Sequence, residues 1–246
     1  MFNRLILSLC MGLHCALIAT QASAGITLSA TRLVFDGEHK EVSIKVRNNG
    51  DDVLIQSWID SDDSGATSVP FAVTPPLARI PGKEQQLLRV IYEGKGMPAD
   101  KESVVWLNVQ EIPQTAKTEN TLQLAVRQRI KVFFRPAGLA STAYLAPTQL
   151  LWQIGKQGGH AALKITNPSL YHVSLSDVSV QAGATTEQAI DSMMIAPGQS
   201  KTIALKGTMN SNYSNLNFSS INDYGAQDRY SATLSANTAV NAQAVQ

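Results

Sequence analysis

The sequence predicts an all-β protein built from two immunoglobulin-like β-sandwich domains, and three observations lead to this. Apolar residues recur at every second position in short runs, as in "KEVSIKVRN" (40–48), where Val42 and Ile44 share one face. A period of two is typical of a strand with one buried side. Turn signals such as "NNGDD" (48–52) separate the runs. After residue 24 there is almost no convincing helical period.

The first 24 residues have the pattern of a secretory signal peptide. Arg4 is followed by an apolar run and then by "ASA" (22–24), the small-residue motif that precedes a cleavage site. The apolar run is too short to be a convincing membrane span. We therefore expect cleavage after Ala24 and an exported chain of residues 25–246 that has no membrane span.

The composition of the mature chain excludes several classes of protein. The chain has 20 Lys and Arg and 19 Asp and Glu residues, and Arg4 is the one charged residue of the signal. The mature chain therefore has no net charge and no global basic field for nucleic acid. Both cysteines, Cys10 and Cys15, lie in the signal. The mature chain therefore lacks disulfides, cysteine nucleophiles and thiolate metal sites, and hydrophobic cores must hold the fold.

The strand-like runs divide into two groups along the chain. Seven fit between residues 25 and 136, and "RPAGLAST" (135–142) follows as a joint. A second group of polar, Ser- and Asn-rich runs comes after it. We therefore expect an N-terminal domain of residues 25–139 and a C-terminal domain of residues 140–246. In the first group, "FAVTPPLARIPG" (71–82) contains three prolines and suits an extended edge segment.

One run, "LQLAVRQRIKVFFR" (122–135), is longer than a domain core requires. Its even positions are mostly apolar, whereas the odd positions include Arg127, Arg129, Lys131 and Arg135. A typical strand has about five or six residues. A long apolar edge favours aggregation unless another chain is meant to pair with it. The competing interpretation is that the basic residues form a solvated face that protects an edge.

No motif for enzyme chemistry or metal binding is present. "DSDDSG" (60–65) resembles the start of a calcium loop, but the twelfth position is Phe71 where such a loop needs Glu. The mature histidines His39, His160 and His172 are scattered without metal-ligand spacing. There is no G-x-S-x-G motif. We therefore expect no catalytic residues, no metal and no cofactor.

Five segments resemble the signature segments of periplasmic pilus-assembly chaperones, the PapD-like partners of outer-membrane ushers. Each segment alone is weak, but all five occur in the order seen in that family and run through the mature chain. They are "ATRLVFDG" (30–37), "TPPLARIPG" (74–82), "LNVQEIP" (107–113), "RIKVFFRP" (129–136) and "INDYG" (221–225).

The resemblance implies a fold and a function. The two immunoglobulin-like domains would form an L with a binding cleft between them, and the protein would act in the periplasm. It would bind and stabilise pilus subunits by lending them the long last strand of its N-terminal domain, and would deliver them to an outer-membrane usher. Strand addition of this kind is a known mode of recognition, and chaperone–pilin complexes are among its examples.

The resemblance also implies particular residues. Leu122, Leu124 and Val126 match the donor positions, and Arg32 and Lys131 match the pair that binds the carboxylate at the C-terminus of the subunit. Lys131 is at an odd-numbered position and the donor residues are at even-numbered positions, so in a regular strand they would point to opposite faces. Strand twist or a bulge must reconcile the two faces.

A second set of matching positions would hold the two domains together: Glu102, Arg135 and Asp223. Exposed ion pairs contribute only about 0–1 kcal/mol, so this network should fix the interdomain angle more than it adds stability. The loop 114–120 is short and resembles the short-loop branch of the family.

One alternative function stays open at this stage. A secreted, β-rich structural protein such as a pilin or adhesin component would share much of this composition. A pilin would have about one domain and would usually carry a disulfide. The two predicted domains and the lack of mature cysteines favour the chaperone.

Overall fold

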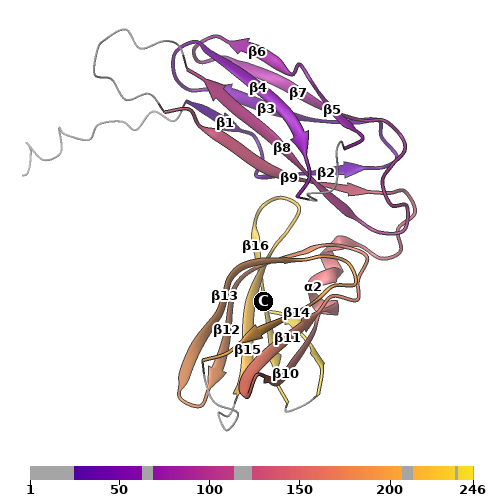
Figure 1. Cartoon of the computed structure of the whole chain (residues 1–246), viewed down its shortest axis with the longest axis vertical. Helices are drawn as coiled ribbons and strands as arrows, with labels where there is room; N and C mark the ends of the chain where they lie inside the picture. The colour runs from indigo at the N-terminus through magenta and orange to yellow at the C-terminus, as the bar shows by residue number, and fades with distance from the viewer. Residues whose placement is uncertain (1–24, 63–68, 114–123, 207–212, 236–237, 246) are drawn as a thin grey trace, which may run out of the picture.

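The chain folds into two β-sandwiches that follow one another in sequence and meet at an angle, like the arms of an L (Figure 1). The structure is a computed structural model, and it describes residues 25–62, 69–113, 124–206, 213–235 and 238–245. Within these residues the helical segments are short: η1 (Ala143–Leu145) and α2 (Ala146–Gln149). The all-β prediction is therefore confirmed, and the predicted signal lies outside the described residues.

The N-terminal sandwich consists of a four-stranded and a five-stranded sheet. The first sheet has the order β1 (Ile26–Leu28), β3 (Glu41–Asn48), β7 (Gln85–Tyr92), β5 (Phe71–Thr74). The second has the order β2 (Arg32–Asp36), β9 (Arg127–Arg135), β8 (Ser103–Ile112), β4 (Val53–Asp60), β6 (Leu77–Ile80).

These nine strands exceed the seven runs that the sequence suggested. One reason is the proline-containing run 71–82, which divides into β5 and β6. Each lies at the edge of a different sheet, with Pro75 and Pro76 between them. The expectation of an edge segment is confirmed, because proline cannot complete the hydrogen-bond ladder of a central strand.

Alternating apolar residues from both sheets fill the N-terminal core. Ile44 and Val46 of one sheet and Leu107 and Val132 of the other are fully or almost fully buried. The aromatic residues gather at one place, where Phe35, Phe71, Tyr92 and Phe134 contact each other; the Tyr92 and Phe134 ring centroids are 4.6 Å apart. Burial of this extent holds the domain without a disulfide.

The C-terminal sandwich has the same construction. Its first sheet has the order β14 (Ser200–Ala204), β11 (His160–Thr166), β10 (Leu151–Gln157), β17 (Val240–Asn241). Its second has the order β13 (Thr185–Ile195), β12 (Val173–Ala182), β15 (Tyr213–Ile221), β16 (Gln227–Thr233), β18 (Gln243–Ala244). Trp152 is fully buried against Phe218, with ring centroids 4.8 Å apart.

The two sandwiches have separate cores, and the segment between Arg135 and Ala143 connects them. One strand pair positions the candidate site beside this connection. β2 runs parallel to β9, although almost a hundred residues separate them in sequence. The register begins with the pair Arg32 and Lys131. An early strand and the last strand of the domain therefore present two cations side by side.

Candidate functional site: a cationic pair beside the interdomain cleft

The parallel register of β2 and β9 determines which side chains share a face. In β9, Ile130, Val132 and Phe134 point into the core, so the residues between them point outward. Arg32 is the Cα partner of Lys131 on the outward face. Two cations therefore lie next to each other on the side of the sheet nearest the C-terminal domain.

Arg32 is held tightly yet is incompletely satisfied. Only 9% of its surface is exposed, and its Nη1 donates a hydrogen bond to the Ile221 carbonyl oxygen at 2.9 Å. Its guanidinium carbon lies 5.5 Å from the centroid of the Phe133 ring. The buried Nε has no hydrogen-bond partner within the described part of the chain. A buried donor without an acceptor is costly, and an arriving anion would satisfy it.

Lys131 is half-buried, and the described residues include no hydrogen-bond or ion-pair partner for its ammonium. Its Nζ lies 5.6 Å from the centroid of the Trp106 ring. Burial and the neighbouring Arg32 charge lower the pKa of Lys131, and Asp62 opposes them only in part. Burial also lowers the pKa of Arg32, against the opposing charges of Asp223 and Glu102. The pair is therefore an electrostatically unsatisfied site that fits a carboxylate.

The three residues matched to the interdomain network lie in direct contact. Arg135 Nε donates to Glu102 Oε2 at 2.7 Å, and both Arg135 Nη atoms donate to the Asp223 carboxylate at 2.7 Å. Burial tends to lower the pKa of Arg135, but the hydrogen bonds and charges of Asp223 and Glu102 outweigh it and raise that pKa above its usual value. This bidentate geometry is the strong form of an arginine–carboxylate pair.

The network differs from expectation in its burial and in a fourth member. The Glu102 side chain is only 1% exposed, so the premise of an exposed ion pair is wrong for this residue. The missed member is His172, whose main-chain N–H donates to Glu102 Oε1 at 2.7 Å and whose Nδ1 lies 2.9 Å from the same oxygen. A lone histidine in a polar run gives no sequence signal for such a contact, which only the docking of the domains creates.

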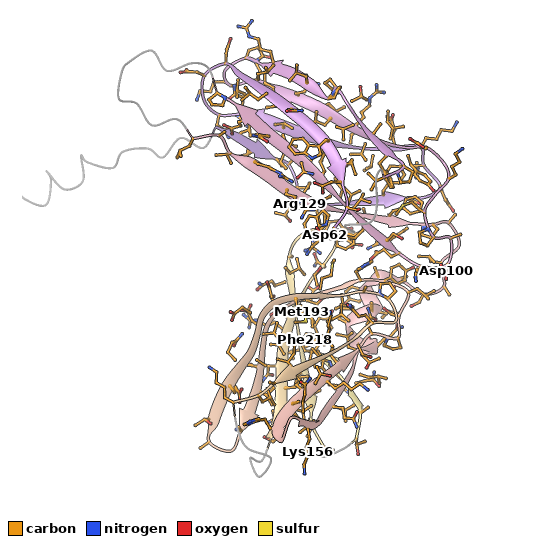
Figure 2. All side chains as sticks on the ribbon, viewed as in Figure 1. Asp62, Asp100, Arg129, Lys156, Met193 and Phe218 are labelled. Atoms are coloured by element: carbon orange, nitrogen blue, oxygen red, sulfur yellow. The ribbon has the colours of Figure 1, made fainter. Side chains whose placement is uncertain are left out.

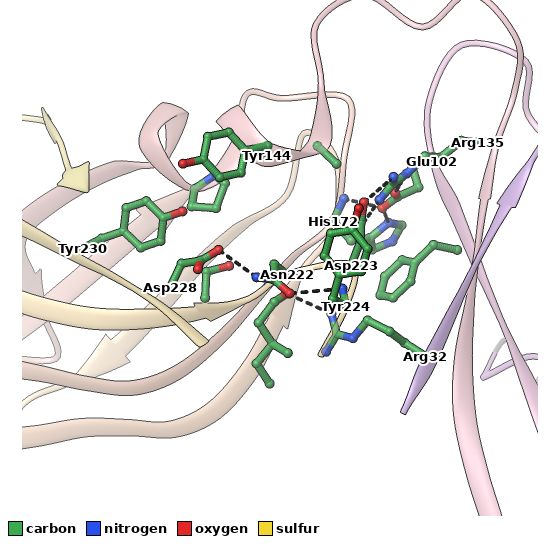
Figure 3. A pocket seen from close by; sticks show the side chains of 15 residues that line it. Arg32, Glu102, Arg135, Tyr144, His172, Asn222, Asp223, Tyr224, Asp228 and Tyr230 are labelled. Atoms are coloured by element: carbon green, nitrogen blue, oxygen red, sulfur yellow. Dashed lines mark hydrogen bonds and ion pairs between the residues drawn. The ribbon is translucent and has the colours of Figure 1, made fainter. Parts of the chain in front are cut away.

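A cleft of about 330 Å³ lies between the domains next to these residues. Figure 3 shows Arg32, Glu102, Arg135 and Asp223 at one end of it, with Tyr144, Tyr230 and Asp228 at the other. Burial, with the charges of Asp228 and Tyr144, raises the pKa of Tyr230 to about 12. One end of the cleft therefore combines two arginines with two carboxylates, and the other end is lined by two tyrosines and Asp228.

The long strand predicted for residues 122–135 is shorter in the structure. β9 begins at Arg127, and residues 124–126 lie outside it, although the Glu111 N–H still donates to the Val126 carbonyl oxygen at 2.9 Å. The last register pair between the two strands is Gln110 and Arg127, so the assigned ladder stops two residues before β8 ends at Ile112. The fourteen-residue strand is therefore wrong for the free chain.

Two of the three donor residues matched by resemblance lie just before β9. Leu124 is 72% exposed and Val126 is 46% exposed, whereas Leu122 lies outside the described residues. The pairing of β9 with β2 and with β8 has no register shift. No bulge within β9 therefore reconciles the face of Lys131 with that of the donor residues.

The basic face of β9 is largely neutralised by two aspartates at and just after the end of β4. Arg129 Nη2 donates to Asp60 and to Asp62, both at 2.8 Å, and its guanidinium carbon lies 4.2 Å from the centroid of the Trp106 ring. Figure 2 shows Arg129 and Asp62 together on the side of the N-terminal domain nearest the C-terminal domain. Arg127 has a similar environment, over Trp58 and paired with Asp60. Lys131 alone of these three lacks an acidic hydrogen-bond partner among the described residues.

Comparison with known proteins identifies the family. Residues 25–140 match the family described as "Pili and flagellar-assembly chaperone, PapD N-terminal domain", and residues 145–232 match "Pili assembly chaperone PapD, C-terminal domain". The chain belongs to the PapD family of pilus-assembly chaperones.

Individual chaperones of this family cover almost the whole chain. The probable fimbrial chaperone YadV of Escherichia coli K12 is 35% identical over 232 residues, which span 89% of this chain and 94% of YadV. The crystal structure of the YadV chaperone has a TM-score of 0.73, at 36% identity over 86% of this chain and 100% of that one. A Salmonella enterica structure of the SafA pilin with its SafB chaperone has a TM-score of 0.71, at 25% identity over 88% of this chain and 99% of its match.

Membership settles the class of protein. The chain is a fimbrial chaperone with the two-domain PapD fold, and this family assembles pili and is not a family of enzymes. The alternative of a structural pilin or adhesin component is not favoured. Among the residues that the structure describes, no helix is long and apolar enough to cross a membrane.

Proposed function

We propose that this chaperone captures pilus subunits in the periplasm by binding the subunit's C-terminal carboxylate between Arg32 and Lys131. The observation that carries the proposal is the pair of adjacent, partly desolvated cations. Arg32 has a buried, unpartnered Nε, and Lys131 has no acidic hydrogen-bond partner in the described chain. A carboxylate would satisfy both groups with charge-assisted hydrogen bonds and would fix the register of any strand that continues from it.

The bound subunit would then run along the exposed end of β9. Leu122, Leu124 and Val126 would provide the alternating side chains of a donated strand. The exposure of Leu124 and Val126 supports this, because large apolar side chains exposed beside a strand can be buried by an added strand. The similar SafB chaperone was solved in complex with the SafA pilin, and this similarity supports a pilin as the partner of this chain.

The remaining parts of the proposal concern processing, partners and boundaries. We propose that residues 1–24 are removed after Ala24 during export, and that the mature chain divides into domains at 139/140. We also propose that the chaperone passes its subunit to an outer-membrane usher, and that Glu102, Arg135 and Asp223 hold the angle between the domains. N-terminal sequencing of the periplasmic protein tests the cleavage site.

The experiment on the cationic pair uses three variants: Arg32→Ala, Lys131→Ala and Arg129→Ala. The first two should lose about 2–5 kcal/mol of subunit-binding free energy, because each leaves a carboxylate partly buried and half paired. Arg129→Ala is the matched control, since this cation lies on the same face of β9 but already pairs with Asp60 and Asp62. It should bind subunits almost normally.

Binding would be measured by pull-down of a subunit co-expressed in the periplasm, with circular dichroism to show that each variant is folded. Mass spectrometry of the captured subunit identifies its C-terminal residues. A subunit whose C-terminal carboxylate is replaced by an amide should bind the unmutated chaperone as weakly as the unmodified subunit binds Arg32→Ala. Capture at the unmutated level by both Arg32→Ala and Lys131→Ala would refute the assignment.

A further inference from the structure

A buried carboxylate lies beside the first residue of the mature chain. Glu111, near the end of β8, is only 9% exposed. Its Oε1 accepts the Ile26 N–H at 2.7 Å. In the part of the chain that the structure describes, no Lys, Arg or His side chain pairs with this carboxylate. Burying a carboxylate without a cationic partner costs free energy, so a cation bound beside Glu111 would stabilise the fold.

Gly25 is fixed against this carboxylate from two directions. The Asn49 N–H donates to the Gly25 carbonyl oxygen at 2.8 Å, and the Ile26 N–H is bound by Glu111. A Cβ atom at Gly25 would collide with both oxygens of the Glu111 carboxylate. The nitrogen of Gly25 is attached to the same Cα as that Cβ position would be. The amino end of residue 25 therefore lies next to Glu111.

We propose that Glu111 is the binding site for the α-ammonium group that signal removal creates on Gly25. The inference rests on the proposed cleavage after Ala24. A signal peptidase hydrolyses the Ala24–Gly25 peptide bond with one water molecule, leaving a carboxylate on Ala24 and an amino group on Gly25. The amino group takes up a proton at neutral pH, because an α-amino pKa is about 7.7–8.0. The neutral amide of the precursor thus becomes a cation with three donors beside a buried anion.

The position of this ion pair connects processing with the donor segment. The Glu111 main-chain N–H donates to the Val126 carbonyl oxygen at 2.9 Å, and Gln128 Nε2 donates to the Ile26 carbonyl oxygen at 2.8 Å. The N-terminus, the end of β8 and the base of the donor segment are therefore bonded to one another. Removal of the signal would add an ion pair between Gly25 and Glu111 at this junction. The mature chaperone would therefore hold its donor segment more firmly than the precursor does.

The test is a double-mutant cycle of four purified proteins. Two begin at Gly25 and carry either Glu111 or Glu111→Gln. The other two carry the same residue choice but keep residues 22–24 as an N-terminal extension, which moves the ammonium away from position 25. With Glu111, the extension should lower the urea midpoint of the N-terminal domain by about 0.5 M and speed the exchange of the Ile26 amide hydrogen. With Glu111→Gln, the extension should change neither quantity.

An equal effect of the extension in both backgrounds would overturn the proposal, because it would show that the two groups are not coupled. A second readout needs no substitution: NMR titration of the α-amino group in the chain that begins at Gly25. Its pKa should lie above the ordinary range, and an ordinary value would contradict the pairing. The neighbouring groups bonded at this junction, the Asn49 main chain and the Gln128 amide, do not titrate.

The pH dependence has a defined sign. Because the ion pair raises the folded-state pKa of the ammonium, its stabilisation is fully present below about pH 7.5 and is lost as pH rises above about 8. The purified proteins have defined N-termini, so their result does not depend on where the cell cleaves. The mass of the exported protein tests the cleavage site separately. A different cleavage site together with a positive cycle would refute the processing step but leave the Gly25–Glu111 pair intact.

Discussion

At the residue scale, two neighbouring cations of β9 differ in how well their charge is satisfied. Arg129 and Lys131 are two positions apart on the same face of β9, yet their surroundings are opposite. Asp60 and Asp62 more than offset the burial of Arg129 and raise its pKa, whereas burial and Arg32 lower the pKa of Lys131. The free protein therefore carries one cation that stabilises the fold and one that opposes it, and the second is available to a partner.

We predict that Lys131→Met makes the free chaperone more stable while it abolishes subunit capture. The folded-state pKa of Lys131 is below its value of 10.5 in the unfolded chain, so the charged form opposes folding at neutral pH. Removing the charge should raise the free energy of unfolding by up to about 1 kcal/mol, a figure kept small because the side chain is half exposed. The gain should vanish as the pH rises past the unfolded pKa, and urea titrations at pH 7 and near pH 10.5 measure it.

Arg129→Met provides the opposite control, since it removes ion pairs with two aspartates and should lower stability by about 0–1 kcal/mol. A fall in the urea midpoint of Lys131→Met as large as that of Arg129→Met would contradict the unsatisfied-cation interpretation.

At the element scale, β9 and the residues just before it differ in burial. Within β9, Ile130, Val132 and Phe134 are buried in the core. The residues before it, Leu124 and Val126, continue the same parity into solvent. One alternating pattern therefore runs from exposed residues before Arg127, the first residue of β9, into the buried part of that strand.

We predict that Leu124→Ser and Leu122→Ser leave the stability of the free protein nearly unchanged and sharply weaken subunit binding. For Leu124 the physical reason is its exposure, since each aliphatic side chain contributes roughly 1.5–3 kcal/mol only where it becomes buried. Ile130→Ala is the matched control on the same parity, and it should cost about 2–5 kcal/mol of folding stability. Urea midpoints and subunit pull-down would be measured separately. A large fall in midpoint for Leu124→Ser, with normal binding by the folded fraction, would show that the segment serves its own domain.

At the scale of the whole molecule, a hairpin of the C-terminal domain reaches across to the N-terminal domain. The turn between β15 and β16 carries Asp223, which binds Arg135, and Gly225. Gly225 has a φ of +85°, and a Cβ there would lie 2.5 Å from Thr31 Oγ1. This glycine therefore satisfies both a left-handed backbone and a close approach between the domains.

We predict that Gly225→Ala changes the interdomain angle and weakens subunit capture. Gly183→Ala is the matched control, because Gly183 also has a positive φ of +62° but a Cβ there meets nothing within 4 Å. The control should lose only about 1 kcal/mol of stability, from backbone strain. Small-angle scattering of each variant measures the change in shape. Adding Thr31→Ala to Gly225→Ala should restore the shape, and a failure of this rescue would show that the contact with Thr31 does not set the angle.

Local chemistry made much of this protein predictable from its sequence. The period of two, the turn residues and the prolines of 71–82 depend on neighbouring residues alone, and they led correctly to an all-β chain with an edge segment at those prolines. The order of five short segments led to the family. The same reasoning overestimated the last strand, because alternation continues to Leu122 whether or not a neighbouring strand exists to pair with it.

By itself, then, the sequence determined the strand-forming runs, the two-domain fold class and the family, since each depends on local periodicity or on order along the chain. Only the tertiary structure decided which groups are satisfied and which are left free. The parallel register of β2 and β9 brings Arg32 beside Lys131. Asp60 and Asp62 neutralise Arg129 but leave Lys131 without an acidic hydrogen-bond partner among the described residues. Domain docking buries Glu102 against His172, whereas Leu124, before the start of β9, is left exposed. Pairing, burial and electrostatic balance depend on residues far apart in the chain, so no local pattern encodes them.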